Sequence, residues 1–315
     1  MTPPAFCLAA PATPPRATQG PFAAAELRRL RATYEPWARG VFQRDLIGRL
    51  PPTERRALDP VTLLMPDELP AVQGIDPGCV LNVAAAPAER QVWLPLRSLA
   101  FLDQYCGVVA ALERRAAPSR TVLLRLHEML LAQPPENGPP PAPLAAFGLD
   151  DGIYADAWVK DVSNKLLNSM VLFVLAHELG HIRHAHAAPA PAARLQQQER
   201  EADAYALATL GRVGVMPLGL TLFFTMAAVM VGQAVTHPLS SSRIEAIAAG
   251  IERDPLAFVD RTEADPWSWV PRLRALAAEL RGAIPLLDDP ASRGDLQRVA
   301  AGLDWARFGD LARAG

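Results

Sequence analysis

The sequence has little cysteine and no excess of charge of either sign. Only three cysteines occur in 315 residues, Cys7, Cys79 and Cys106, and no CxxC pair is present. The odd number and wide spacing argue against a disulfide framework or a cysteine zinc site. We therefore expect buried or free thiols. The formal net charge of −2 lacks the basic surplus of nucleic-acid-binding proteins, so no nucleic-acid partner is expected.

A secretory signal is not apparent at the start of the chain. Residues 1–20 contain five prolines and no basic residue before Arg16. The longest apolar run, residues 5–10, is bounded by proline and is shorter than a signal sequence requires. These features predict a flexible proline-rich tail at 1–20 and a cytoplasmic protein.

Long apolar runs are also scarce, and only residues 218–235 raise the question of a membrane. This stretch is uncharged for 18 residues, the lower limit for a spanning helix. It is interrupted by polar residues and glycines, and no basic residues follow it closely. A buried core helix is favoured, and membrane association through Leu218–Val235 is the alternative.

Helical periodicity dominates the remaining pattern and predicts an α+β, mainly α protein. Two β-type runs, 79–83 and 91–94, predict a small hairpin, and 51–77 resembles loops with short helical turns. Pro36 is expected to end or kink a first helix that begins at Phe22. Further helices are predicted at 96–115, 119–132, 162–187, 193–213, 217–235, 240–253, 266–281 and 291–312.

The same pattern suggests how the chain is organised. A proline-rich break separates two halves, and the helical second half carries most of the histidines. The predicted divisions are a tail (1–20), a helical region with a small β-hairpin (21–133), a linker (134–148), a helical core (149–255) and a helical C-terminal extension (256–315).

Four of the six histidines lie within ten residues, and two of them form an HExxH motif at 177–181. On a helix, His177 and His181 share a face and can bind one metal ion. Glu178 is rotated by about 100° and can face a water in the open coordination position. Zinc lowers the pKa of such a water to near 7, so that a carboxylate can accept its proton. HExxH alone also occurs by chance in amphipathic helices.

A third ligand is expected from the helical stretch after the turn at 187–192. A catalytic zinc usually has three protein ligands. If the two helices are antiparallel about residue 190, Glu199 lies opposite His181 and Asp203 lies opposite His177. Glu199 is then the ligand, and Asp203 accepts the other N–H of a zinc-bound imidazole. The alternative is that both acids are solvated surface charges.

Two further residues could reach this site from a third element. His237 ends an apolar helix and Arg243 begins the next. His237 is a candidate catalytic residue that stabilises an oxyanion or occupies the open zinc position, with Arg243 in support. The alternatives are a helix C-terminal cap for His237 and a structural ion pair for Arg243.

The remaining histidines of the cluster are not predicted to bind the metal. The metzincin pattern HExxHxxGxxH is excluded, because His184 and Ala187 stand at its glycine and final histidine positions. His184 and His186 are expected at the surface of the helix end, with an auxiliary metal ligand as the alternative. His127 has no partner in sequence and is expected to be structural.

With HExxH at 177–181 and ExxxD at 199–203, the chain resembles the gluzincin metallopeptidases. It is most similar to the HtpX/CAAX prenyl protease-like family, through the AHELGH segment, the EREAD segment and His237-Pro followed by Arg243-Ile. The short gap of 17 residues between His181 and Glu199 is more similar to ImmA/IrrE-type or Lit phage-exclusion-type cytoplasmic proteases. The resemblance implies that 149–255 is a helical zincin-like catalytic core. It also implies zinc ligands His177, His181 and Glu199, with Glu178 as general base.

Together these observations predict a zinc metalloendopeptidase with one Zn²⁺ per chain, acting on a protein or peptide. The reaction is hydrolysis by a metal-bound water with Glu178 as general base. An extended substrate could pair with an exposed edge strand at 91–94. The alternatives are a zinc hydrolase of a non-peptide amide and a non-enzymatic scaffold with a degenerate motif.

Overall fold

The computed structural model describes residues 24–67, 83–115, 142–186, 190–230 and 239–289. Most of these residues are helical, and a three-stranded sheet completes the fold. The elements in chain order are α1 Ala24–Gly40, the π-helix η1 Val41–Leu46, the 3-10 helix η2 Ile47–Arg49, α2 Pro52–Leu58, β1 Thr62–Leu64, β2 Ala84–Ala86, β3 Gln91–Trp93, α3 Leu96–Arg114, α5 Pro143–Ala146, η4 Asp151–Ala155, α6 Ala157–Arg183, α7 Ala192–Val213, α8 Leu220–Met230, α9 Ser241–Arg253, η5 Pro255–Phe258, η6 Pro266–Trp269, α10 Val270–Arg281 and α11 Ile284–Asp288.

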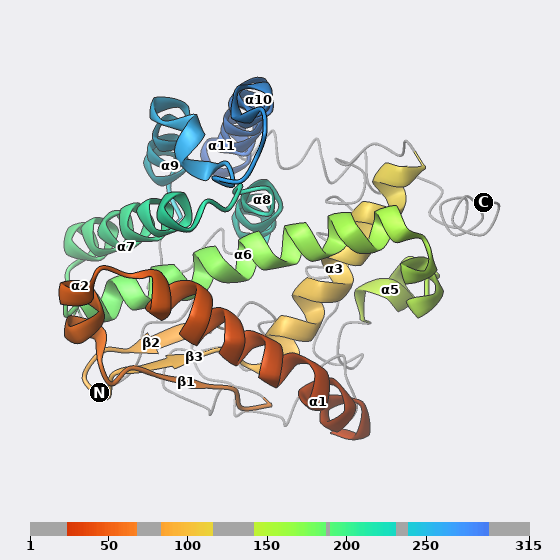
Figure 1. Cartoon of the computed structure of the whole chain (residues 1–315), viewed down its shortest axis with the longest axis horizontal. Helices are drawn as coiled ribbons and strands as arrows, with labels where there is room; N and C mark the ends of the chain where they lie inside the picture. Colours follow the sequence, from red (N-terminus) through yellow and green to blue (C-terminus); the bar gives the residue numbers. More distant parts are fainter. Residues whose placement is uncertain (1–23, 68–82, 116–141, 187–189, 231–238, 290–315) are drawn as a thin grey trace.

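The long helix α6 crosses the centre of the molecule (Figure 1) and contacts elements on both sides. Helix α7 packs along α6 and is itself covered by α9, on which α10 packs. On the other side, α3 crosses α6, and the sheet lies under the C-terminal half of α6. One apolar core joins these layers, from Leu27 in α1 through Val174 in α6 to Leu273 in α10. The predicted mainly helical α+β fold is confirmed. Where the chain divides into domains stays a prediction.

The sequence of α6 explains both its start and its central position. The Asp156 carboxylate accepts hydrogen bonds from the backbone N–H groups of Trp158 and Val159, which caps the first turn. Residues 169–182 are all buried. A helix that is apolar on every side must be enclosed by other elements, and α6 therefore forms the axis on which the other layers pack.

The small sheet differs from the predicted hairpin in strand position and in strand number. β2 pairs antiparallel with β3, as a hairpin requires, but it lies at Ala84–Ala86; residues 79–82 lie outside the described part of the chain. β1, in a stretch expected to be loops, pairs parallel with the other side of β3, with Leu63 opposite Val92. The prediction of an exposed edge strand at 91–94 is therefore wrong, because β3 is central in the order β1-β3-β2.

Helix α1 continues through Pro36 to Gly40 and does not end at the proline. Ion pairs bridge this position, since Glu35 binds both Arg31, 3.1 Å away, and Arg39, 2.6 Å away. Burial of Tyr34 and Ala38 on the core side also holds the helix together. These contacts offset the hydrogen bond that proline cannot donate.

The other predicted helices are found wherever the structure describes the chain. α3, α7, α9 and α10 lie within a few residues of the expected bounds, and α6 begins five residues earlier than expected. The predicted tail and the predicted helices at 119–132 and 291–312 lie outside the described residues. Among the helices described, none combines the length and the apolar character needed to cross a membrane.

Candidate metal centre

The candidate site lies where α6 and α7 approach most closely. A Cβ atom placed on Gly180 would lie 3.0 Å from the Cα atom of Ala202, so any larger residue would push the two helices apart by a few tenths of an ångström. The two helices run antiparallel (Figure 1), and their contact brings carboxylates of α7 next to the imidazoles of α6. The register inferred from the sequence is the one observed, with Glu199 beside His181 and Asp203 beside His177.

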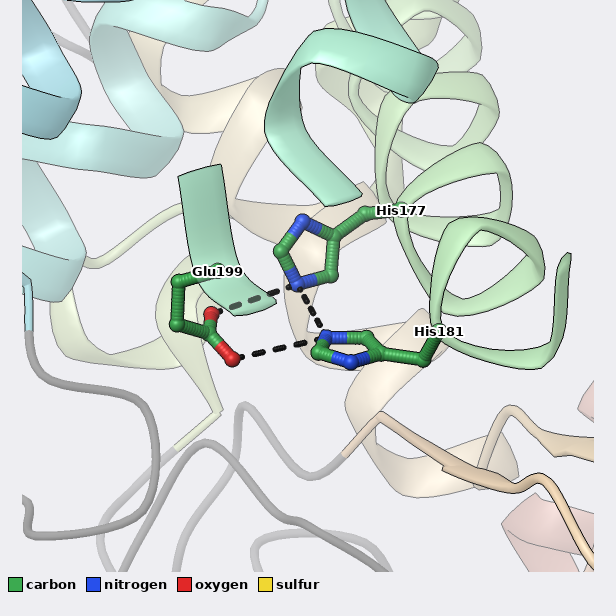
Figure 2. Close-up of side chains that lie close together, drawn as sticks. All are labelled: His177, His181 and Glu199. Atoms are coloured by element: carbon green, nitrogen blue, oxygen red, sulfur yellow. Dashed lines mark hydrogen bonds and ion pairs between the residues drawn. The ribbon is translucent and has the colours of Figure 1, made fainter. Parts of the chain in front are cut away.

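Three side chains converge in this contact (Figure 2). The Nε2 atoms of His177 and His181 are 3.0 Å apart. Glu199 places one carboxylate oxygen 3.4 Å from the Nε2 of His177 and the other 3.4 Å from the Nε2 of His181. Each of the three residues is at most 1% exposed. Within the described residues they form the one group of histidine, cysteine or acidic side chains with the spacing of a metal site.

The spacing of these donor atoms fits a small divalent metal ion. Zinc binds imidazole nitrogen and carboxylate oxygen at about 2.0–2.2 Å in tetrahedral geometry, so its donors lie about 3.3 Å from one another. The two Nε2 atoms are 3.0 Å apart, and each lies 3.4 Å from a different oxygen of Glu199. One ligand atom from each residue lies within 4.8 Å of the others, so all three residues can bind one ion. Two imidazoles and one carboxylate leave a fourth position free for water or substrate, as in catalytic rather than structural sites.

A buried ion pair lies behind His177. The Nδ1 of His177 is 2.9 Å from an oxygen of Asp203. Arg243, from the start of α9, donates to the same carboxylate twice, through Nε at 2.7 Å and Nη2 at 2.9 Å. Its Nη1 lies 3.0 Å from a Glu199 oxygen. Arg243 therefore fixes the two acids of α7 relative to each other and to the imidazole.

The charges in this interior also favour a divalent cation. Glu178, Glu199 and Asp203 are buried with a single guanidinium, that of Arg243. When all four are ionised, two negative charges remain uncompensated, and one divalent ion balances them. Buried charge without compensation is costly. The balance of buried charges and the positions of the donors thus point to the same kind of ligand.

The pKa values of the ionisable groups reflect the same balance. Burial lowers the pKa of His177, but hydrogen bonds and charge from Asp203 and Glu199 outweigh it and raise the pKa to about 10. Burial raises the pKa of Asp203, and the charge of Arg243 together with two hydrogen bonds lowers it further than burial raises it. Without a metal, His177 therefore carries a proton at neutral pH.

Glu178 and His237 are the two side chains predicted to act in catalysis. Glu178 is fully buried on the same turn of α6 as His177, and its charge is one of those that raise the pKa of Arg243. It therefore belongs to the same electrostatic cluster as the three donors. His237 lies outside the described residues, and its role stays a prediction.

His186 was expected at the surface, and this expectation is wrong. Its side chain is buried, with Nδ1 2.9 Å from the Nδ1 of His181 and Nε2 2.9 Å from a Glu201 oxygen. Burial lowers the pKa of His186, opposed in part by Glu201. His184 is exposed, as predicted, and its ring stacks on that of His186 with centroids 5.4 Å apart.

Sequence reasoning therefore missed Gly180, His186 and Glu201. The HELGH segment carried a signal for Gly180, since a glycine inside a helix often marks a close packing contact. Glu201 is rotated by about 200° from Glu199 around the axis of α7, and the chain beyond the end of α6 folds back to that side and brings His186 to it. No periodic pattern reveals such a turn.

Comparison with known proteins agrees with the chemistry of this cluster. Residues 131–260 match the Peptidase U49 family. The matched segment contains α6 to α9 and so includes all the donor residues, Glu178, Asp203 and Arg243. The match to Peptidase U49 supports peptidase activity on protein or peptide substrates. No curated protein and no solved structure matches the chain.

Proposed function

We propose that this protein is a zinc-dependent metalloendopeptidase of the gluzincin type, with His177, His181 and Glu199 as metal ligands. The observation that carries the proposal is the convergence of three buried side chains, whose ligand atoms, one from each residue, lie within 4.8 Å of one another. Two nitrogen donors and one oxygen donor with an open fourth position are typical of hydrolytic zinc sites. The match to Peptidase U49 supports the reaction class.

In this proposal zinc, when bound, supplies a polarised carbonyl and a water of lowered pKa. The protein's own groups perform the remaining steps. Glu178 accepts the proton of the attacking water and returns it to the leaving amine, so that a free amine departs. Asp203 holds the Nδ1–H of His177, which leaves the Nε2 lone pair directed at the metal. Arg243 keeps both acids of α7 in place.

The experiment measures metal content and peptide cleavage on the same preparations. We expect one zinc per wild-type chain, and strong loss of zinc in His177→Ala and Glu199→Ala. Glu178→Gln should retain zinc but lose turnover, because the amide cannot accept the proton. Cleavage is followed by mass spectrometry on a complex peptide mixture, with Glu245→Gln, an exposed acid on α9, as the matched control.

Two results would contradict the proposal. Wild-type protein without stoichiometric zinc would remove the metal site. Unchanged cleavage by Glu178→Gln would remove the assigned base and leave the metal site standing.

A further inference from the structure

The second ring nitrogen of His181 does not face the metal position. Its Nε2 points toward His177 and Glu199, whereas its Nδ1 is 2.9 Å from the Nδ1 of His186. His186 in turn places Nε2 2.9 Å from an oxygen of Glu201. The three side chains form a chain of contacts that leads from the metal position toward the surface of α7.

The far end of this chain is a fixed hydrogen-bond acceptor. One oxygen of Glu201 accepts a hydrogen bond from Gln197 at 2.7 Å and lies 3.6 Å from Arg194. The other oxygen faces His186. An ionised carboxylate can only accept, so the Nε2 of His186 must donate.

The carboxylate of Glu201 determines which ring nitrogens of His186 and His181 carry a proton. A neutral imidazole carries one N–H, so His186 with Nε2–H presents a lone pair at Nδ1. The Nδ1 of His181 must then be the donor of the short contact between the two rings. A neutral His181 with Nδ1–H has its lone pair on Nε2, the atom that faces the metal position. The arrangement thus selects the metal-binding tautomer of His181.

The chain turn that places His186 is specific. α6 ends at Arg183, and Ala185 adopts a left-handed conformation with φ of 51°. The N–H of Ala185 then donates to Ile182, and the N–H of His186 donates to the carbonyl of His181 at 3.0 Å. These two bonds form a Schellman motif, which folds the chain back over the last turn. Alanine rarely adopts this conformation, which is disfavoured for side chains with a Cβ atom.

We propose that His186 and Glu201 are positioning residues for the metal ligand His181, acting as a two-residue relay of hydrogen bonds that fixes its tautomer and orientation. The inference rests on the proposed function, since it concerns the same metal site. It assigns to His181 a support distinct from the Asp203–Arg243 pair that holds His177. Partners of this kind typically contribute tenfold to a hundredfold to metal affinity.

The test compares two substitutions of His186. His186→Phe keeps a ring but removes the acceptor, and zinc affinity should fall by about tenfold to a hundredfold. His186→Asn places an oxygen close to the position of Nδ1, so it can accept from His181 and should restore most of the affinity. Affinity is measured by titration with Zn²⁺ against a chromophoric chelator. His184→Phe, an exposed neighbour on the same turn, is the matched control and should bind as wild type.

A second measurement does not depend on how a variant folds. Nitrogen-15 NMR of histidine-labelled, zinc-loaded wild-type protein distinguishes the tautomers of each ring. We expect Nδ1–H on His181 and Nε2–H on His186. A protonated Nδ1 on His186 would overturn the inference, even if His186→Phe failed to fold.

The outcomes separate the inference from the function on which it rests. Zinc binding by wild type with equal affinity in His186→Phe would overturn the relay and leave the metal site intact. Equal losses in His186→Phe and His186→Asn would also overturn it, because loss of packing alone would then explain both. Wild type that binds no zinc would overturn the proposed function and the inference together.

Discussion

The two histidines of the HExxH motif are held in different ways, although they are four residues apart on one helix. His177 is held by Asp203, a buried carboxylate that is itself paired twice with the buried guanidinium of Arg243. His181 contacts a neutral ring, His186, which in turn contacts a carboxylate near the surface. One support consists of charges enclosed in the core, and the other ends in partly exposed Glu201.

This difference shows that a motif can specify ligands without specifying their environment. Charges inside a protein interact strongly and are costly to separate. The contact between the rings of His181 and His186 is neutral and lies at the edge of the core, so breaking it leaves less buried charge without a partner. We call Asp203 and Arg243 the His177 side of the site, and His186 and Glu201 the His181 side. We expect the His177 side to govern stability and proton uptake, and the His181 side to tune metal affinity.

The largest loss of stability is expected from Arg243→Met, which removes the guanidinium from the His177 side. The substitution leaves Asp203 and Glu199 buried without their guanidinium, and removing one partner of a buried ion pair costs about 3–5 kcal/mol. Urea denaturation of the metal-free protein measures the free energy of unfolding. The expected loss is large because Arg243 is buried, with only 2% of its surface exposed.

Arg281→Met provides the matched control for this prediction. Arg281 also binds two carboxylates, Glu245 and Glu252, at distances of 2.7 to 2.9 Å, but on the surface between α9 and α10. Exposed ion pairs contribute little, so its loss should be much smaller. Similar losses in the two variants would show that burial does not set the difference.

The next largest loss of stability is expected from Gly180→Val, which pushes apart α6 and α7, the helices that carry His177 and Asp203. The added side chain meets the Cα of Ala202 and the carbonyl oxygen of the same residue at 3.0 and 3.3 Å. Overpacking of this kind costs about 1–3 kcal/mol, and zinc affinity should fall with it. Gly40→Ala is the control, because a Cβ there meets only the Arg44 side chain at 4.0 Å. Wild-type affinity in Gly180→Val would refute the close-packing argument.

The sequence allowed the helix pair and its register to be predicted in physical terms. HExxH and ExxxD place donors at positions that share a helix face, and the proline-rich turn sets how the two faces meet. The resulting pairs, His181 with Glu199 and His177 with Asp203, follow from counting residues on either side of the turn. This part of the prediction depends on helix periodicity, which is strong in long elements.

Helix periodicity could predict neither the strands of the sheet nor the contact of His186 with His181. β1 and β2 have three residues each, too few to show a period of two. β2 consists only of alanine, a residue depleted in strands, so its burial under α6 decides its conformation. His186 depends on a left-handed alanine at position 185. Its dihedral angles are set by tertiary contacts and leave no mark in the pattern.

A smaller effect is expected in the number of protons released on metal binding, which should depend on the His177 side and not on the His181 side. Asp203 and Glu199 raise the pKa of His177 to about 10, above its unfolded value of 6.5. The stability that this gives the metal-free protein is therefore complete below pH 6.5 and lost as the pH rises through 10. At pH 7.5 metal binding should displace the His177 proton and release about one proton per metal from this residue.

Calorimetry of zinc binding in buffers of different ionisation enthalpy measures the released protons. Asp203→Asn should reduce the number, because it removes one of the groups that raise the pKa of His177. His186→Asn should not reduce it, since His186 does not contact His177. A binding enthalpy that is independent of the buffer would contradict the raised pKa.

The smallest effect is expected from Ala185→Gly, at the turn that serves the His181 side. Alanine at φ of 51° carries left-handed strain of about 1–2 kcal/mol, and glycine relieves it but gains freedom in the unfolded chain. The net result should be stabilisation by about 0.5–1 kcal/mol, measured by thermal and urea unfolding of the metal-free protein. Zinc affinity should stay unchanged, because both hydrogen bonds of the turn use backbone atoms. Destabilisation would mean that the Cβ of Ala185 makes contacts worth more than the strain, and the turn would then be set by packing rather than by its hydrogen bonds.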